Sequence, residues 1–173
     1  ILGPCDRTVL FMKQMTHHLV DLDLGFLGRT VNVLLTRDPV EMLPSLDRIL
    51  DEPTLRDTGY QGQADLLARL RALGQQPPVI DSRELLRNPS RVLSRLCEAV
   101  GILPDARMLT WEPGARPEDG VWAPHWYGSV HKSTGFQPYR AKKEPFPARL
   151  QPLLDECQPY YDTLYELAIK AED

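Results

Sequence analysis

One stretch of the sequence, residues 31–45, predicts a strand that passes at once into a helix. Residues 31–36 form a nearly continuous apolar run, which is typical of a strand covered on both faces. Asp38 suits the N-cap of the helix, Pro39 suits its first position, and Glu41 completes a capping box. A buried strand followed directly by a capped helix favours an α/β fold.

Arg37 lies between this strand and this helix and predicts an anion site. Free N–H groups and the helix dipole at a helix N-terminus add to the charge of a guanidinium. Ser45 lies two turns along the helix, where its hydroxyl can return toward the same anion. Many ordinary α/β units have the same pattern, and there Arg37 and Ser45 would only cap the helix or form surface contacts.

Other segments continue the alternation of strands and helices. Further strands are predicted at residues 8–15 and 77–82. The buried side chains of the first of these would be Val9, Leu10, Phe11 and Met12. Helices are predicted at residues 39–50, 60–73, 88–100 and 148–171. Such alternation implies right-handed crossovers. The predicted fold class is therefore α/β, with an open, mainly parallel sheet and flanking helices.

Between Trp111 and Arg140 the periodicity stops, and Gly, Pro and aromatic residues dominate. An irregular stretch of this length inside a compact domain is usually functional or disordered, and the tryptophans, histidines and tyrosines argue against plain disorder. We expect a single domain in which residues 1–110 form the α/β core, 111–140 an irregular loop at the active site, and 141–173 a helical segment.

Composition limits the possible partners. The 173 residues carry a net charge of −4, which argues against general binding to nucleic acid or acidic membranes, so an anion site must be local. No apolar run approaches the ~20 residues that span a bilayer. Cys5, Cys97 and Cys157 have no CxxC spacing, which favours free thiols and a cytoplasmic protein. The four histidines have no helical pairing typical of a zinc site, so no metal is expected.

Four segments resemble, in the correct order, the motifs of the P-loop-type sulfotransferase family. They are residues 9–18 (VLFMKQMTHH), 37–45 (RDPVEMLPS), 81–89 (DSRELLRNP) and 130–135 (VHKSTG). The tail that follows looks like that of bacterial sulfotransferases. The resemblance covers most of the chain and implies a P-loop NTPase-like sulfotransferase fold that is truncated at its N-terminus.

The resemblance implies a reaction and roles for particular residues. The expected cosubstrate is 3′-phosphoadenosine 5′-phosphosulfate (PAPS), which would give its sulfuryl group to a hydroxyl or amine of a small molecule or sugar and leave as 3′-phosphoadenosine 5′-phosphate (PAP). Lys13 would steady the bridging oxygen, and His17 or His18 would take the acceptor proton. The non-catalytic alternatives are that Lys13 is a solvated lysine and that the two histidines cap the end of a strand.

The same resemblance assigns the residues that bind the cosubstrate. Arg37 and Ser45 would hold the 3′-phosphate, and Lys132 would lie in a loop that closes over the nucleotide, or would simply be exposed. Apart from the resemblance, the irregular stretch contains an aromatic patch that could wall an acceptor pocket or stack on a ring, or would only pin the loop onto the core: Trp122, His125, Trp126 and Tyr127.

The sequence departs from the family pattern at three points, one of which is that Ser82 stands where the family often has a tyrosine near the adenine. The histidines follow Lys13 by four and five residues rather than two. No Gly/Ser-rich loop for the 5′-phosphosulfate lies upstream of Lys13. We expect that this loop precedes Ile1 in the natural chain, that another chain supplies it, or that the domain is inactive.

Two other functions are considered. One is a non-catalytic nucleotide-binding or interaction domain that retains only the 3′-phosphate site. The other is a P-loop kinase relative, which is disfavoured because no Walker-B Asp accompanies a Mg²⁺-binding loop. The expected partners are the nucleotide and a small-molecule acceptor, with no nucleic acid and no membrane; the sequence favours no particular oligomeric state.

Overall fold

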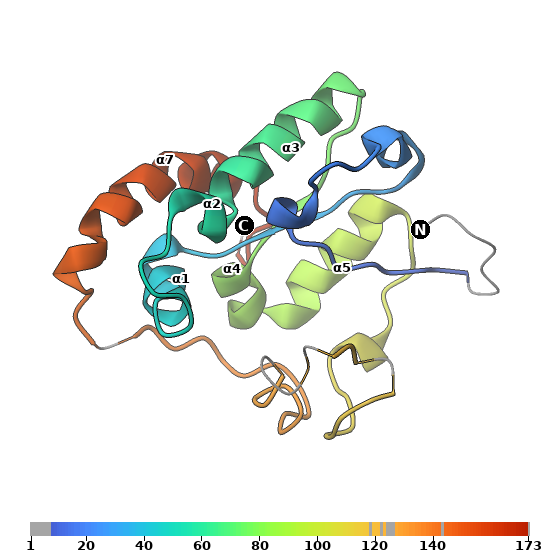
Figure 1. Ribbon diagram of the computed structural model, residues 1–173. Helices are drawn as coiled ribbons and strands as arrows, with labels where there is room; N and C mark the ends of the chain where they lie inside the picture. Colours follow the sequence, from blue (N-terminus) through green and yellow to red (C-terminus); the bar gives the residue numbers. More distant parts are fainter. Residues whose placement is uncertain (1–7, 118, 122, 124–126, 143, 173) are drawn as a thin grey trace. The chain divides into compact units, whose positions relative to one another are not determined.

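The computed structural model describes residues 8–117, 119–121, 123, 127–142 and 144–172 (Figure 1). The chain divides into two compact units, one of Ile1–Ser82 with Lys142–Ala168 and one of Arg83–Ala141 with Ile169–Asp173. Each unit is described by itself below. The single domain with boundaries after residues 110 and 140 stays a prediction.

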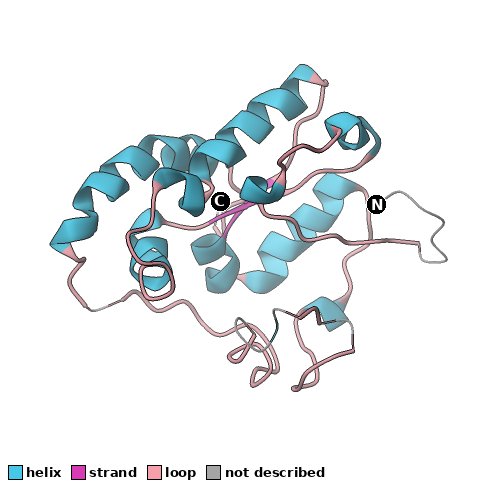
Figure 2. Ribbon diagram, in the orientation of Figure 1, coloured by secondary structure: helices cyan, strands magenta, loops and turns pink. Residues whose placement is uncertain are grey.

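The first unit contains a small parallel sheet (Figure 2). Strand β1 (Leu34–Thr36) pairs with β2 (Val79–Asp81), with Leu34 opposite Val79 and Thr36 opposite Asp81. Strands are confirmed within both predicted segments, 31–36 and 77–82, and the two pair in parallel, as a mainly parallel sheet requires. The first strand is shorter than predicted because the side-chain amide of Asn32 donates to the carbonyl groups of Leu27 and Thr30, which holds the chain before Leu34 in a turn.

The predicted strand at residues 8–15 is wrong. This segment is irregular in the structure, and a short 3-10 turn, η1 (Thr16–His18), follows it. The predicted burial of its four apolar side chains is also wrong, since Val9, Leu10, Phe11 and Met12 are 54%, 56%, 81% and 36% exposed. Within the described residues the sheet consists of β1 and β2, so the segment has no neighbouring strand to accept its backbone hydrogen bonds.

The helices of the first unit cover the sheet and one another. They are α1 (Pro39–Leu46), α2 (Leu55–Thr58), α3 (Tyr60–Ala72), η4 (Ala148–Leu150) and α7 (Gln151–Glu166), with a 3-10 segment, η2 (Leu24–Arg29), before β1. Figure 1 shows α7 alongside α1 and α2, and α7 also packs on α3. In the described ranges no helix is both long and apolar enough to cross a bilayer.

Two of these helices end earlier than predicted. Helix α1 stops at Leu46 rather than residue 50, after Pro44 has removed one backbone donor from its last turn. Helix α7 stops at Glu166 rather than residue 171, because Ala168 leaves the helix to form a parallel bridge with Val79. Helix α3 matches its prediction, and Gly74 follows it at a positive φ of 80°.

The core of the first unit consists of two apolar clusters. The cluster between the sheet, α3 and α7 contains Leu34, Leu67, Val79, Leu164 and Ala168. The cluster between α1, α3 and α7 contains Leu43, Tyr60, Leu150, Cys157 and Tyr161. Because β1 contributes to one cluster and α1 to the other, the turn between them is held from both sides.

The second unit is built around α4 (Ser82–Arg87) and α5 (Pro89–Val100), followed by the short turn η3 (Ala106–Met108). The side chain of Asn88 caps α5 by accepting from Arg91 N–H. An antiparallel bridge between Thr110 and Gly135 closes the stretch that follows. Most described residues of 111–140 lie outside helices and strands, and the irregular loop at the active site stays a prediction.

Packing around α7 generates a test of this core. Leu164 is fully buried, so we expect Leu164→Ala to lower the free energy of unfolding by about 2–5 kcal/mol. Leu167→Ala, at a position 41% exposed in the turn that follows α7, should cost under about 1 kcal/mol. Urea unfolding followed by circular dichroism measures both. Equal losses in the two variants would contradict the packing described here.

Candidate anion site at the end of strand β1

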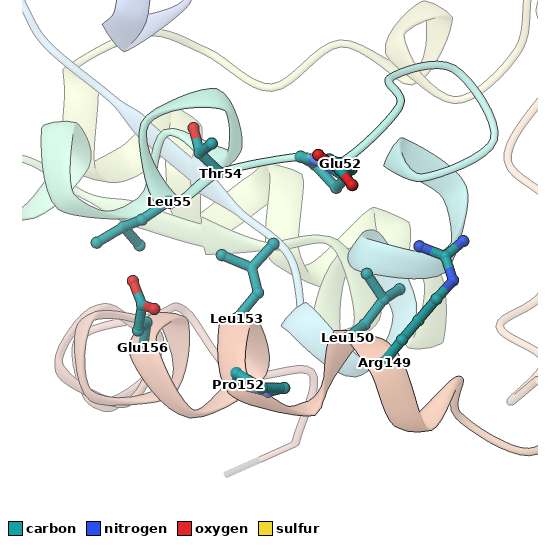
Figure 3. A pocket seen from close by; sticks show the side chains of 9 residues that line it. Glu52, Thr54, Leu55, Arg149, Leu150, Pro152, Leu153 and Glu156 are labelled. Atoms are coloured by element: carbon teal, nitrogen blue, oxygen red, sulfur yellow. The ribbon is translucent and has the colours of Figure 1, made fainter.

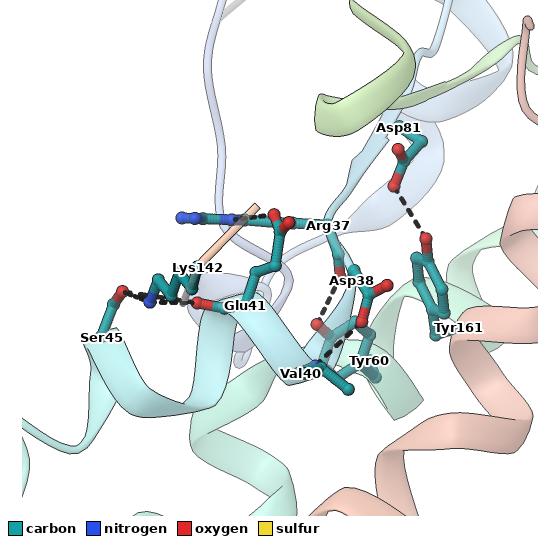
Figure 4. Close-up of polar contacts among 9 residues, drawn as sticks. All are labelled: Arg37, Asp38, Val40, Glu41, Ser45, Tyr60, Asp81, Lys142 and Tyr161. Atoms are coloured by element: carbon teal, nitrogen blue, oxygen red, sulfur yellow. Dashed lines mark hydrogen bonds and ion pairs between the residues drawn. The ribbon is translucent and has the colours of Figure 1, made fainter. Parts of the chain in front are cut away.

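Arg37 leaves the sheet at the carboxyl end of β1, where the next residues begin α1 (Figure 4). Thr36, the last residue of β1, is 2% exposed and pairs with Asp81 of β2, so the end of the strand is buried and held in the sheet. The Asp38 carboxylate accepts from Val40 N–H at 2.9 Å and so caps α1. The predicted N-cap is therefore confirmed. Since this carboxylate takes one of the free helix donors, an anion near Arg37 would depend more on side chains than on the helix N-terminus.

The hydroxyl of Tyr60 fixes the backbone of Arg37. It donates to the Arg37 carbonyl at 2.6 Å, from a ring that is 2% exposed. Burial raises the pKa of this hydroxyl well above its ordinary value. Tyr60 therefore keeps its proton, and remains a donor to Arg37, throughout the range in which proteins are studied.

The Arg37 side chain is partly open to solvent. Its guanidinium Nε lies 3.6 Å from Glu41 Oε2, and the side chain is 43% exposed. Glu41 is 12% exposed, but a pair this long with a solvent-facing arginine contributes little, about 0–1 kcal/mol. An incoming dianion can therefore compete with Glu41 for the guanidinium.

Lys142 contacts helix α1 at Glu41 and Ser45. Lys142 Nζ donates to the Glu41 carbonyl at 2.8 Å and to Ser45 Oγ at 3.0 Å (Figure 4). Burial lowers the pKa of Lys142, and the positive charges of Arg37 and Arg48 lower it further. Glu41 and Glu144 act in the opposite direction and raise this pKa, so the ammonium lies among charges of both signs. Guanidinium, ammonium and hydroxyl groups arranged in this way suit a phosphate or sulfate.

Lys142 was not among the predicted site residues. It lies 97 positions from Ser45, in an irregular segment whose spacing gives no periodic signal. Its only signal in the sequence is the lysine pair at 142–143.

The predicted catalytic residues precede the sheet. Lys13 is exposed in the irregular segment, and η1 carries both histidines. The Thr16 hydroxyl donates to the Gly59 carbonyl at 3.2 Å, which anchors η1 at the start of α3, next to Tyr60.

The two histidine rings meet edge to face, with centroids 4.5 Å apart. Burial and the neighbouring His18 lower the pKa of His17, so His17 is neutral near pH 7, the form that a base requires. In the described part of the chain no hydrogen bond or ion pair joins Lys13, His17 or His18 to Arg37, and their catalytic roles stay predictions.

The remaining predicted residues lie in the second unit. Lys132 is exposed in a turn in which its N–H donates to the Ser129 carbonyl. The neighbouring His131 pairs with Asp119 at 2.8 Å and packs edge to face on Tyr127. The roles of Lys132 and Tyr127 stay predictions. The other predicted acceptor residues, outside the described residues, are Trp122, His125 and Trp126.

Comparison with known proteins identifies the family. The family model described as a sulfotransferase domain matches residues 4–168. The chain belongs to the sulfotransferase domain family. Two proteins of Arabidopsis thaliana, branched-chain-amino-acid aminotransferase-like proteins 2 and 1, are similar to it, with 34% and 37% identity over 165 residues. Those residues are 95% of this chain but only 29% and 30% of the relatives, so it spans about three tenths of their length. No solved structure matches.

This sulfotransferase domain also has a surface groove of about 440 Å³ between the loop before α2 and the start of α7 (Figure 3). Leu55 and Leu153 supply apolar walls, and Arg149 at its end is paired with Asp47. Arg37, Ser45 and Lys142 do not line this groove, so the anion site is a separate, open feature. Among the described residues, no three histidine, cysteine or carboxylate side chains gather in a way that could hold a metal ion.

The shifted pKa of Lys142 generates a pH prediction. Because its pKa lies below the ordinary lysine range, Lys142 loses its charge earlier than a free lysine as the pH rises. Sulfate, whose own charge is constant there, should therefore bind less tightly as the pH rises through that pKa. Titration by ¹³C NMR of the lysine Cε signals should show the Lys142 pKa returning toward normal in Arg37→Ala. Arg69→Ala, at an exposed position on α3, should leave it unchanged. An unaltered Lys142 titration in Arg37→Ala would exclude the cationic cluster.

Proposed function

We propose that this domain binds the 3′-phosphate of PAPS and takes part in transfer of the sulfuryl group to a hydroxyl or amine of a small-molecule or sugar acceptor. The observation that carries the proposal is the hydrogen bond from Lys142 to Ser45 on α1, with Arg37 just before this helix and near enough to lower the pKa of Lys142, in a chain of the sulfotransferase domain family. We also propose that the small parallel sheet belongs to an open sheet of the P-loop type and that the protein is cytoplasmic.

The donor set fits a phosphate dianion. The planar guanidinium of Arg37 can bind two phosphate oxygens side by side. The Lys142 ammonium adds a second positive charge, and the Ser45 hydroxyl, which donates to the Glu41 carbonyl at 3.4 Å, would rotate to donate to a third oxygen. PAPS, when bound, supplies the sulfuryl group that is transferred.

For the transfer itself, His17 or His18 would accept the proton of the acceptor group. Lys13 would stabilise the negative charge on the bridging oxygen. The lowered pKa of His17 supports a neutral imidazole that can accept a proton. Lys132 would close over the nucleotide, and Trp122, His125 and Trp126 would contact the acceptor.

One observation favours a second candidate function, binding without catalysis. Residues 8–15, which include Lys13, are exposed rather than part of the sheet, so Lys13 is not held in a fixed geometry. A domain of this kind would retain the 3′-phosphate site and lack transfer activity. Transfer of ³⁵S from PAPS to a panel of phenols, amines and sugars separates the two functions.

Isothermal titration calorimetry with PAP tests the proposed site. We expect PAP to bind more tightly than adenosine 5′-phosphate, because only PAP carries the 3′-phosphate. Arg37→Ala and Lys142→Gln should each weaken PAP binding by about tenfold or more, as expected when a charge-assisted hydrogen bond worth ~1.5–3 kcal/mol is lost. Ser45→Ala should have a smaller effect, since its hydroxyl is neutral.

Arg69→Ala, which removes an exposed arginine on α3, serves as the matched control and should leave PAP binding unchanged. Equal affinity of the folded wild-type chain for PAP and adenosine 5′-phosphate would contradict the proposed 3′-phosphate site. PAP binding together with no ³⁵S transfer to any acceptor would favour the binding-only function.

A further inference from the structure

Two tyrosine hydroxyls lie at the carboxyl ends of the two paired strands (Figure 4). Tyr60, from α3, donates to the carbonyl of Arg37 just after β1 at 2.6 Å. Tyr161, from α7, donates to Asp81, the last residue of β2, at 3.1 Å. Since Thr36 pairs with Asp81 in the sheet register, both hydroxyls serve the same edge, where a parallel α/β sheet places its ligand.

The Tyr60 ring itself has little freedom to move. It is 2% exposed, belongs to the cluster between α1, α3 and α7, and meets the Tyr161 ring edge to face with centroids 6.4 Å apart. Gly59, just before it, has a φ of 78°, and a Cβ at that position would lie 3.0 Å from Thr16 Oγ1. Close packing on all these sides fixes the position of the hydroxyl.

The direction of Arg37 depends on its backbone more than on its side-chain contacts. Its guanidinium is half-exposed, and among the described residues its ion pair is the long one with Glu41 at 3.6 Å. The peptide after Arg37 is instead held by a short bond from a buried donor, between a paired strand and a capped helix. The Cα–Cβ bond of Arg37, and hence the start of its side chain, is therefore oriented by this turn.

We propose that Tyr60 is a positioning residue that orients Arg37 toward the 3′-phosphate, an inference that rests on the proposed function of the site. Tyr60 does not touch the nucleotide. Loss of its hydroxyl leaves the Arg37 carbonyl without this donor and lets the turn rotate, so that the guanidinium samples orientations that miss the phosphate. Displacements near 1 Å are enough to weaken such contacts markedly.

The experiment compares Tyr60→Phe with Tyr160→Phe. Both substitutions remove one hydroxyl and keep the ring. Tyr160 packs on the same cluster, but its hydroxyl forms no hydrogen bond within the described part of the chain. Calorimetry with PAP and with adenosine 5′-phosphate gives the discrimination due to the 3′-phosphate, and the thermal midpoint of each variant reports its stability.

We expect Tyr60→Phe to weaken PAP about tenfold and to change the affinity for adenosine 5′-phosphate less than twofold. Tyr160→Phe should bind both nucleotides as the wild type does. A purely structural role of Tyr60 predicts a different result, in which stability falls and both nucleotides weaken together. Such a parallel loss, or an unchanged affinity for PAP, overturns the proposal.

A second measurement separates this inference from the proposed function. In ¹⁵N-edited NMR spectra of the chain without nucleotide, the Arg37 Nε–H signal reports the order of the guanidinium directly. We expect it to be resolved in the wild type and in Tyr160→Phe and to broaden or shift to the exposed-arginine position in Tyr60→Phe. An Arg37 signal unchanged in Tyr60→Phe overturns the positioning role. If the folded wild type binds no PAP, the proposed function is wrong, and the Arg37 signal alone decides whether Tyr60 orients Arg37.

Discussion

The parallel pairing of β1 with β2 is the constraint on which the rest of the first unit depends. It brings the ends of two segments that are about 45 positions apart to one edge, with Thr36 opposite Asp81. Helices α3 and α7 then cover this pair and deliver Tyr60 and Tyr161 to the strand ends. The turn between β1 and α1 is held by the tyrosine hydroxyls, by the strand register and by both apolar clusters. Arg37 therefore leaves the sheet in a defined direction.

Charged side chains of both signs surround this turn. Asp38 is used as the cap of α1, and Glu41 gives Arg37 only a long ion pair, while Lys142 comes from the far end of the sequence to the same helix. Burial, Arg37 and Arg48 lower the pKa of Lys142, while Glu41 and Glu144 raise it, and a bound anion would further favour the charged lysine. The site therefore differs from the helix-terminus anion site expected from the capping pattern, because its charge comes mainly from side chains.

The predicted catalytic segment behaves differently from the predicted phosphate segment. Residues 31–45 contain an apolar run, an N-cap and a proline at N1, and they form the expected strand followed by a helix, with the strand limited to Leu34–Thr36. Residues 8–15 carry only the apolar run, and without a neighbouring strand in the described part of the chain they stay exposed. Strand propensity alone does not form a strand, because its backbone groups must pair with another chain segment. The histidines that follow are held instead by Thr16 at the start of α3.

The sequence by itself determined where several helices begin and end and half of the candidate site. Asp38 and Pro39 began α1, Gly74 and Gly101 followed the ends of α3 and α5, and Arg37 with Ser45 could be named from their spacing, since each of these signals acts within a few residues. Only the tertiary structure decided that Lys142 joins Ser45 and that Tyr60 holds Arg37. Those contacts span 97 and 23 positions and depend on how helices pack on the sheet, which no local pattern encodes.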